Sequence, residues 1–206
     1  MSISSQELIK LRKDEIVNAC AKLYQTMSFK DITIKEIGNV TSFTRTSIYN
    51  YFQTKEEIFL SLLKNEYLLW IDDLNMIISK NDTLSKEELS HNIAKSLEKR
   101  VNLLKLISMN LYDIEENSRI EHLVDFKKVY VKSIETVEKC INKFCINMDT
   151  IEKEKFIYLF FPFMYGIYPY TMVTDRQRKA MTLANIDFKD MSIYDIAYTG
   201  ILKLLK

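Results

Sequence analysis

Glycine and proline are scarce in this chain, whose 206 residues contain three glycines and two prolines. All-β and doubly wound α/β folds need many tight turns, and such turns depend on glycine, proline and Asn-Gly pairs. The scarcity therefore predicts an all-α protein with long helices. Hydrophobic residues make up 47% of the chain, so these helices can bury a core. The sequence also lacks the Gly-rich phosphate-binding motifs G-x-G-x-x-G and Walker A.

Charge and cysteine content restrict the classes of partner and compartment. The chain has 29 Lys and Arg against 28 Asp and Glu, a net charge of +1, so any binding of DNA must come from a local surface. Its three cysteines, Cys20, Cys140 and Cys145, are an odd number without zinc-finger spacing and predict buried thiols in a reducing compartment. The first ten residues, MSISSQELIK, have no apolar signal core. We therefore expect a cytoplasmic protein.

The uncharged run of 19 residues from Phe156 to Thr174 approaches the length of a membrane span, which needs about 20 residues. However, it contains four tyrosines and two prolines. This composition favours a buried helix at a protein interface, and no membrane partner is expected.

Helix-start patterns recur along the chain. The capping box, in which a Ser, Thr or Asp is followed three residues later by Glu, occurs at residues 4–7, 33–36, 54–57, 85–88 and 149–152. Apolar residues at helical spacing follow each of these starts. About nine to ten helices are expected, over residues 6–27, a short stretch after 33, 44–52, 54–80, 85–109, 110–116, 119–147, 150–171, 175–185 and 192–206.

Two short helices joined by a brief turn, after a longer helix, are typical of a helix-turn-helix motif. The second short helix, TRTSIYNYF, turns Ile48 and Phe52 inward. Its outward residues have the groups that read bases and phosphates: Arg45, Thr46, Ser47, Tyr49 and Asn50. Further candidates for phosphate contacts are Thr33 and Thr44, at helix N-termini, and Lys55 at the same edge. Thr33 and Thr54 are equally well explained as plain helix caps.

The run from Arg12 to Leu63, about a quarter of the chain, resembles the DNA-binding domain of TetR/AcrR-type transcriptional regulators. The most specific segments are FKDITIKEIG and SIYNYFQTKEEIF. The resemblance implies that Phe29 packs against the first helix and that Thr33 caps the second. It also implies backbone contacts to DNA from Tyr49, Asn50 and Lys55, and base contacts from Arg45, Thr46 and Ser47.

Three positions depart from the family pattern, because Ser28, Ser42 and Thr46 stand where the family usually has glycine. At Ser42 we expect either a small backbone strain or a shifted turn, since glycine tolerates a positive φ. Thr46 replaces a glycine that lets the recognition helix approach DNA closely, so the preferred operator is expected to differ from those of relatives.

The resemblance implies a three-helix DNA-binding domain over residues 1–53 and a helical ligand-binding and dimerisation domain over residues 54–206. Aromatic and Met residues suit an apolar small-molecule pocket, although each is also explained as ordinary core. The pocket candidates are Tyr67, Trp70, Met109, Tyr112, Phe126, Tyr130, Phe160 and Met164. The candidates for a twofold dimer interface are Phe163, Ile167, Tyr168, Tyr194, Tyr198 and Ile201. No metal or cofactor is expected.

An all-α enzyme is the main alternative from another class. A di-iron carboxylate bundle needs two Glu-x-x-His motifs, and the chain has one, Glu88-x-x-His91, because Arg119 stands three residues before His122. The sequence therefore predicts no catalysis. The resemblance implies a ligand-responsive repressor that binds a palindromic double-stranded DNA operator as a homodimer and is released by a small apolar or aromatic effector. A helical adaptor without DNA binding and a transcriptional activator remain as alternatives.

Overall fold

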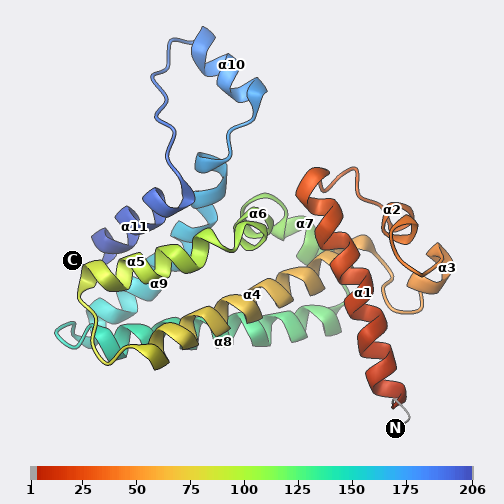
Figure 1. Ribbon diagram of the computed structural model, residues 1–206, viewed down its shortest axis with the longest axis horizontal. Helices are drawn as coiled ribbons and strands as arrows, with labels where there is room; N and C mark the ends of the chain where they lie inside the picture. Colours follow the sequence, from red (N-terminus) through yellow and green to blue (C-terminus); the bar gives the residue numbers. More distant parts are fainter. Residues whose placement is uncertain (1–3, 206) are drawn as a thin grey trace. The chain divides into compact units, whose positions relative to one another are not determined.

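The computed structural model describes residues 4–205, and within this range the chain forms eleven helices and no strand, which confirms the all-α prediction (Figure 1). The helices are α1 (Ser5–Thr26), α2 (Ile34–Asn39), α3 (Arg45–Ile48), α4 (Lys55–Lys80), α5 (Lys86–Glu98), α6 (Val101–Met109), α7 (Leu111–Glu116), α8 (Ile120–Phe144), α9 (Thr150–Thr171), α10 (Asp175–Leu183) and α11 (Ile193–Leu204).

By its internal contacts the chain divides into two compact units. Unit 1 contains the residues up to Glu66 together with Asn110–Tyr130, and unit 2 contains Tyr67–Met109 and the residues from Val131 onward. Helices α4 and α8 therefore each contribute residues to both units. The functional boundary expected between residues 53 and 54 remains a prediction, since contact-based units need not coincide with functional domains.

Capping side chains fix most helix starts. Reciprocal capping boxes form at Ser4 with Glu7, at Ser85 with Glu88 and at Asp149 with Glu152, as the sequence predicts. Two further boxes begin α10 and α11, where Gln177 and Asp195 take the place of the usual Glu.

The prediction of one helix over residues 85–109 is wrong, because the chain breaks between α5 and α6. Arg100 lies at the break, and its Nε and Nη2 atoms donate to Oδ2 of Asp73 at 2.9 and 2.6 Å. Nη2 also donates to the carbonyl of Leu69 at 3.4 Å. These contacts hold Arg100 against α4 and allow α6 to begin in a new direction.

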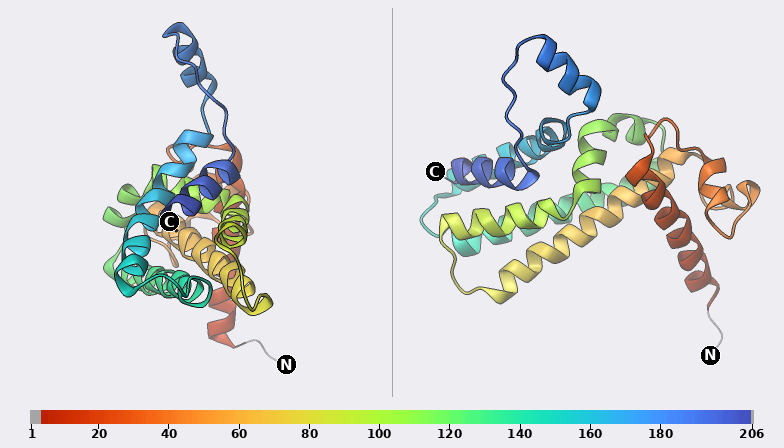
Figure 2. Two further views of the ribbon diagram at one scale, coloured as in Figure 1. Left: turned by 90° about the vertical axis from the view of Figure 1, so that its left-hand side faces the viewer. Right: turned by 45° about the horizontal axis from the view of Figure 1, so that its top comes forward.

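The core of unit 2 is built around Trp70, the only tryptophan of the chain. Its Nε1 donates to Oγ of the buried Ser96 at 3.0 Å. Its ring stacks on Phe160, with centroids 6.2 Å apart, and meets Phe161 edge to face. Helix α11 packs on α5 and α9, and α6 packs on α9 (Figure 2). The uncharged run of α9 is therefore partly buried in the protein's own core.

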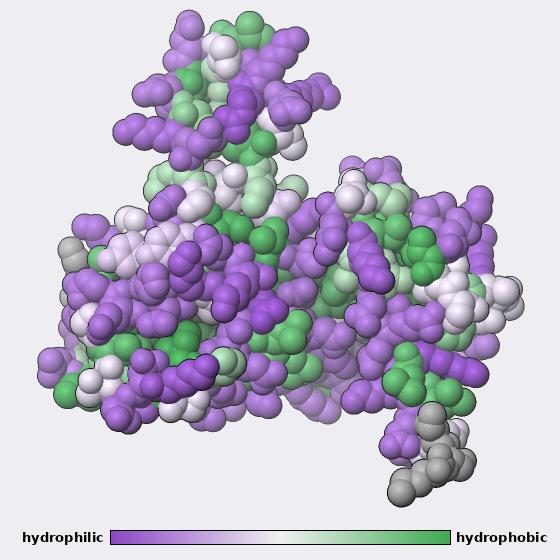
Figure 3. Space-filling model, in the orientation of Figure 1, coloured by the Kyte–Doolittle hydropathy of each residue, from purple (hydrophilic) through white to green (hydrophobic). Residues whose placement is uncertain are grey.

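Helix α10 and its flanking loops protrude from the rest of unit 2 (Figures 1 and 2). No residue of α10 is buried, and the nearby apolar residues Leu183 and Ile186 are 76% and 57% exposed. Figure 3 shows hydrophobic residues on this protrusion among hydrophilic ones. Between residues 4 and 205 no single helix is long and apolar enough to span a membrane, and only α9 and α10 taken together, with a 78° bend between them, reach that length and composition.

Candidate DNA-binding surface

The framework of the site is the helix trio α1, α2 and α3 in unit 1, in which α2 packs on both of its neighbours. Ile34 and Ile37 of α2 are buried, and so are Ile48 and Phe52 around α3. The inward orientation predicted for Ile48 and Phe52 is thus confirmed. Helix α3 is shorter than predicted, because its four residues are followed by a turn in which Tyr51 and Phe52 both donate to the carbonyl of Ile48.

Two threonines cap the short helices. The Oγ1 of Thr44 accepts from the backbone N–H of Ser47 at 3.2 Å and lies 2.9 Å from Oγ of Ser47. The Oγ1 of Thr33 accepts from the N–H of Glu36 at 3.3 Å and donates to its carboxylate. Both hydroxyls are therefore engaged as caps in the DNA-free protein, and their contact with phosphate remains a prediction.

The residues predicted to contact bases (Arg45, Thr46 and Ser47) lie on α3, and two predicted backbone contacts, Tyr49 and Asn50, follow it directly. Arg45, Thr46, Tyr49 and Asn50 are exposed, and Ser47 is half-buried. The guanidinium of Arg45 lies 5.7 Å from the ring centroid of Tyr49 and donates to its hydroxyl at 3.3 Å. Arg45 is thereby held along the outer face of α3, with the rest of its N–H groups available to a ligand.

Lys55 begins α4 beside Phe29. Its Nζ donates to the carbonyl of Phe29 at 2.7 Å and lies 4.3 Å from the ring centroid. The ring of Phe29 in turn contacts Phe59, which meets Tyr24 of α1 edge to face. An ammonium group has three N–H donors, so Lys55 keeps donors for a phosphate while one is bound to Phe29.

The two serines at the family's glycine positions are accommodated without left-handed backbone, because Asn185 is the only non-glycine residue of the described chain with a positive φ. Of the two expectations at Ser42, the structure therefore shows no strain from a positive φ, and the shifted turn remains a prediction. The N–H of Ser42 donates to Oε1 of Glu15 at 2.8 Å, and this hydrogen bond lowers the pKa of Glu15.

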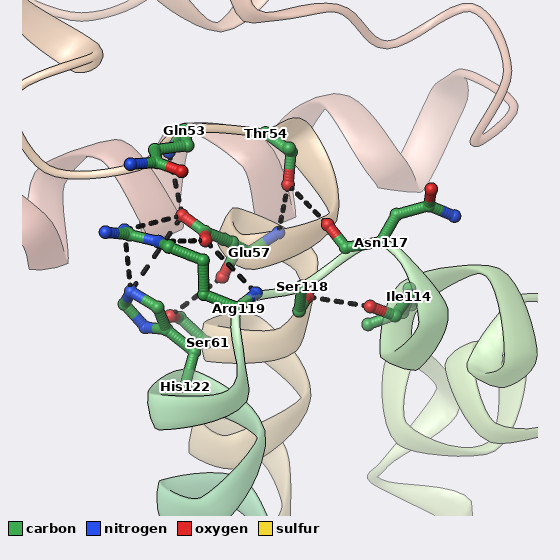
Figure 4. Close-up of polar contacts among 9 residues, drawn as sticks. All are labelled: Gln53, Thr54, Glu57, Ser61, Ile114, Asn117, Ser118, Arg119 and His122. Atoms are coloured by element: carbon green, nitrogen blue, oxygen red, sulfur yellow. Dashed lines mark hydrogen bonds and ion pairs between the residues drawn. The ribbon is translucent and has the colours of Figure 1, made fainter.

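A polar cluster around Glu57 was not predicted, although Thr54-x-x-Glu57 was identified as a capping box (Figure 4). The N–H of Glu57 donates to Oγ1 of Thr54 as expected, but its carboxylate accepts instead from the N–H of Gln53, at 2.7 Å. Arg119 supplies three further donors to this carboxylate. We call Gln53, Thr54, Glu57, Asn117, Arg119 and His122 the Glu57 cluster. No local pattern identifies Arg119 as the partner, because it lies 62 residues away.

The cluster keeps Glu57 ionised although the side chain is 0% exposed. Burial raises the pKa of Glu57, but hydrogen bonds from Arg119 and from the Gln53 N–H outweigh it, so the pKa is lowered overall. Burial together with the nearby positive charges of Arg119, Lys13 and Lys64 lowers the pKa of His122 against the opposing effect of Glu57. A neutral His122 can accept the contact from Nη2 of Arg119, which lies 3.0 Å from its Nε2.

The predicted pocket residues are distributed over both units. In unit 2, Tyr67, Trp70, Phe160 and Met164 are buried, whereas Met109 is exposed. Unit 1 contains the other three, of which Phe126 is buried, Tyr130 half-buried and Tyr112 exposed.

Two surface cavities of unit 2, each of about 190 Å³, are lined mainly by polar residues and by none of these pocket candidates. The aromatic residues around Trp70 pack on one another in this structure. Whether they line a pocket thus remains a prediction.

The predicted dimer residues lie on α9 and α11. Phe163, Tyr168, Tyr194 and Tyr198 are half-buried, whereas Ile167 and Ile201 are buried within the single chain. Tyr194 stacks on Tyr198, with centroids 5.7 Å apart, and its hydroxyl lies 2.8 Å from Nδ1 of His91. Their role in a dimer is likewise still a prediction.

Comparison with known proteins identifies the family. Residues 64–192, more than half of the chain, match the model of the tetracycline repressor-like C-terminal domain. No curated protein sequence matches the chain significantly.

Two solved structures share the fold. The fatty acid degradation regulator FadR from Bacillus halodurans is 12% identical with a TM-score of 0.60, and 100% of this chain and 96% of that chain are covered. The transcriptional regulator FadR from Bacillus subtilis, solved in complex with stearoyl-CoA, is 16% identical with a TM-score of 0.59, over 93% and 96% of the two chains. At these identities the likeness shows the fold alone. The match over residues 64–192 shows more: the chain belongs to the TetR/AcrR-type family of transcriptional regulators.

Proposed function

We propose that the protein is a homodimeric repressor that binds a palindromic operator and is released by an apolar small molecule. Each subunit inserts α3 into a major groove, where Arg45, Thr46 and Ser47 contact bases. Tyr49, Asn50 and Lys55 contact the backbone phosphates. Catalysis has no part in this function.

The observation that carries this proposal is the division of α3 into two faces. Ile48 is fully buried, while Arg45, Thr46, Tyr49 and Asn50 remain exposed with their polar groups outward. A short helix with one buried anchor and an exposed Arg, followed directly by an exposed Tyr and Asn, presents groups suited to contacts with bases and phosphates.

The proposed effector is a molecule with a long acyl chain. The Bacillus subtilis regulator with the same fold was solved in complex with stearoyl-CoA. In the present chain, Trp70, Phe160 and Phe161 form an aromatic cluster in unit 2. We propose that an apolar effector separates this packing and favours a state with lower operator affinity, since a ligand shifts an equilibrium only by its preference for one state.

The proposed dimer is formed through α9 and α11. Tyr158, Leu159 and Tyr170 of α9 are 81%, 50% and 70% exposed in the single chain. Large apolar surface of this kind commonly marks a protein interface. In a twofold dimer α9 and α11 of both subunits form a four-helix contact.

The test begins with selection of duplexes from a random DNA library by the wild-type protein, followed by anisotropy titrations of the selected duplex and of a scrambled duplex. We expect tight binding of the selected duplex only, with affinity that falls steeply as salt is raised. Stearoyl-CoA is expected to release the protein, and CoA alone is the matched control. Failure to enrich any duplex would favour the helical adaptor, and tighter binding with stearoyl-CoA would favour an activator.

The dimer is tested separately by sedimentation of the DNA-free protein. A mass of two chains is expected, and a single chain at micromolar concentration contradicts the proposal. Tyr158→Asp and Tyr170→Asp place charges on the proposed contact surface and are expected to shift the protein toward single chains. Lys139→Asp, at an exposed site of α8, is the matched control.

A further inference from the structure

Glu57 links the turn after the recognition helix to a segment far away in the sequence. Its Oε2 accepts from the N–H of Gln53, which lies in the connection between α3 and α4. Its Oε1 accepts from Nε of Arg119 at 2.5 Å and from the Arg119 N–H at 3.3 Å, and Oε2 accepts from Nη2 at 2.9 Å. One carboxylate therefore joins the start of α4 to the turn before α8 (Figure 4).

Two further contacts join the same two segments. The Oγ1 of Thr54 donates to the carbonyl of Asn117 at 3.0 Å. The ring of His122 lies 6.3 Å from that of Phe52, and Phe52 is almost fully buried. Three consecutive residues after α3 are thus held in place by these contacts: Phe52 lies beside His122, and Gln53 and Thr54 belong to the Glu57 cluster itself. This agrees with the contact-based division, in which Asn110–Tyr130 belongs to unit 1 together with α1, α2 and α3.

The shortness of α3 gives these contacts their importance. A helix of four residues has a single internal turn, so its direction depends on Ile48 and on the turns at its two ends. At its N-terminal end Thr44 caps the helix, and at its C-terminal end the turn continues directly into Gln53. Loss of the Gln53 contact would therefore permit α3 to shift, and a displacement of Arg45 and Asn50 would misalign them with the base edges and the phosphates that they are proposed to contact.

Loss of the ion pair between Arg119 and Glu57 would change the state of the Glu57 carboxylate. A buried carboxylate without its partner must take up a proton, admit water or leave its site. Each of these changes disturbs the acceptor of the Gln53 N–H. The side chain of Arg119 is 42% exposed, and its contact with the turn runs through Glu57.

We propose that Arg119 is a positioning residue for DNA recognition: through Glu57 it fixes the turn Phe52–Thr54 and thereby the direction of α3. The segment Asn110–Tyr130 is then a functional part of the DNA-binding unit, although Tyr67–Met109 of unit 2 separates it in the sequence from the rest of unit 1. It also lies within the stretch expected to serve the ligand domain. This inference rests on the proposed function.

The central test compares Arg119→Met with Arg100→Met. Arg100 is the matched control, because it also donates twice to a carboxylate, that of Asp73, but within unit 2. Affinity for the duplex selected by the wild type is measured at a temperature where circular dichroism shows each variant folded. We expect Arg119→Met to weaken binding by about tenfold or more, since the buried partner is left uncompensated, and Arg100→Met to change it by less than about twofold. Arg119→Lys keeps the charge and is expected to recover part of the loss.

Two readouts separate positioning from other roles. The slope of log affinity against log salt is expected to stay at the wild-type value for Arg119→Met, whereas a slope reduced by about one would identify Arg119 as a direct phosphate contact and overturn the proposal. Amide hydrogen exchange without DNA is expected to accelerate at Gln53 and Phe52 in Arg119→Met and to stay unchanged there in Arg100→Met.

The exchange measurement needs no operator, so it decides the positioning role even if the wild type binds no duplex, a result that would contradict only the proposed function. Wild-type exchange at Gln53 in Arg119→Met, or full operator affinity in that variant, overturns the inference.

Discussion

The Nε atom of Arg119 lies 2.5 Å from Oε1 of Glu57, a carboxylate with no exposed surface. The pKa of Glu57 is lowered, so its contribution to stability is present above the pKa of the unfolded chain, about 4.3, and is lost as the pH falls through the lower folded value. Glu57→Gln removes the charge but keeps a similar shape. We expect it to lower the free energy of unfolding at pH 7 by about 3 kcal/mol, and we expect the difference from wild type to shrink below about pH 4.

Urea unfolding of both proteins between pH 7 and pH 3.5 measures this difference. Glu7→Gln is the control, because Glu7 is an exposed capping residue whose pKa is also lowered, first by the backbone N–H of Ser4. If the free energy of unfolding of Glu57→Gln stays below that of the wild type by the same amount over the whole pH range, the ionisation of Glu57 does not contribute to stability.

Arg45 and Lys55 are expected to affect DNA binding in different ways, because one is proposed to contact bases and the other phosphates. Arg45→Ala should cost about 1–3 kcal/mol on the selected operator and little on scrambled DNA, because a base contact discriminates between sequences. Lys55→Ala should weaken both duplexes alike and reduce the salt slope by about one. Anisotropy titrations at several salt concentrations measure both effects, with Lys139→Ala, at an exposed lysine of α8, as the control. Equal losses on the two duplexes for Arg45→Ala would count against base reading.

The sequence predicts those parts of the structure that depend on neighbours along the chain. The capping boxes at Ser4, Ser85 and Asp149 form as expected, because a cap and its partner lie three residues apart. The inward placement of Ile48 and the outward placement of Arg45 likewise follow from helical periodicity.

Contacts between distant residues explain what the sequence did not predict. The break between α5 and α6 depends on Arg100 reaching Asp73, 27 residues earlier, and no local helix-breaking residue marks it. The capping box at Thr54 is half-formed because Arg119 and the Gln53 N–H compete for Glu57. In both cases the tertiary fold brings an arginine next to a carboxylate. The spacing of apolar residues along the chain does not predict such a pair.

Ser96 is the acceptor for the indole N–H of Trp70 inside unit 2. Ser96→Ala leaves this buried donor without a partner, so we expect the free energy of unfolding to fall by about 1–3 kcal/mol. Ser90→Ala is the matched control, because Ser90 is equally buried but donates only to the Lys86 carbonyl of its own helix. Urea unfolding, followed by Trp70 fluorescence, compares the two variants. Equal losses of unfolding free energy would show that the hydrogen bond from the indole does not contribute to stability beyond an ordinary serine contact.

Gly200 of α11 faces the ring of Phe163 in α9 at a distance that leaves no room for a side chain. A Cβ at this position would lie 2.6 Å from Cε2 of Phe163 and nearer still to Cζ, so the ring would have to move. Gly200→Ala is therefore expected to lower the free energy of unfolding by about 1–3 kcal/mol, as overpacked cores do. Gly166→Ala is the matched control: nothing lies within 4 Å of its Cβ, and the gain in helix propensity should stabilise the protein by about 0.5–1 kcal/mol.

The double variant Gly200→Ala with Phe163→Leu tests the cause of this loss. A smaller side chain at position 163 vacates the space that the new methyl group needs, so the pair should be more stable than the sum of the single effects implies. Thermal unfolding of the four proteins gives the coupling energy directly. Additive losses in this cycle would mean that the Phe163 ring is not what excludes a side chain at position 200.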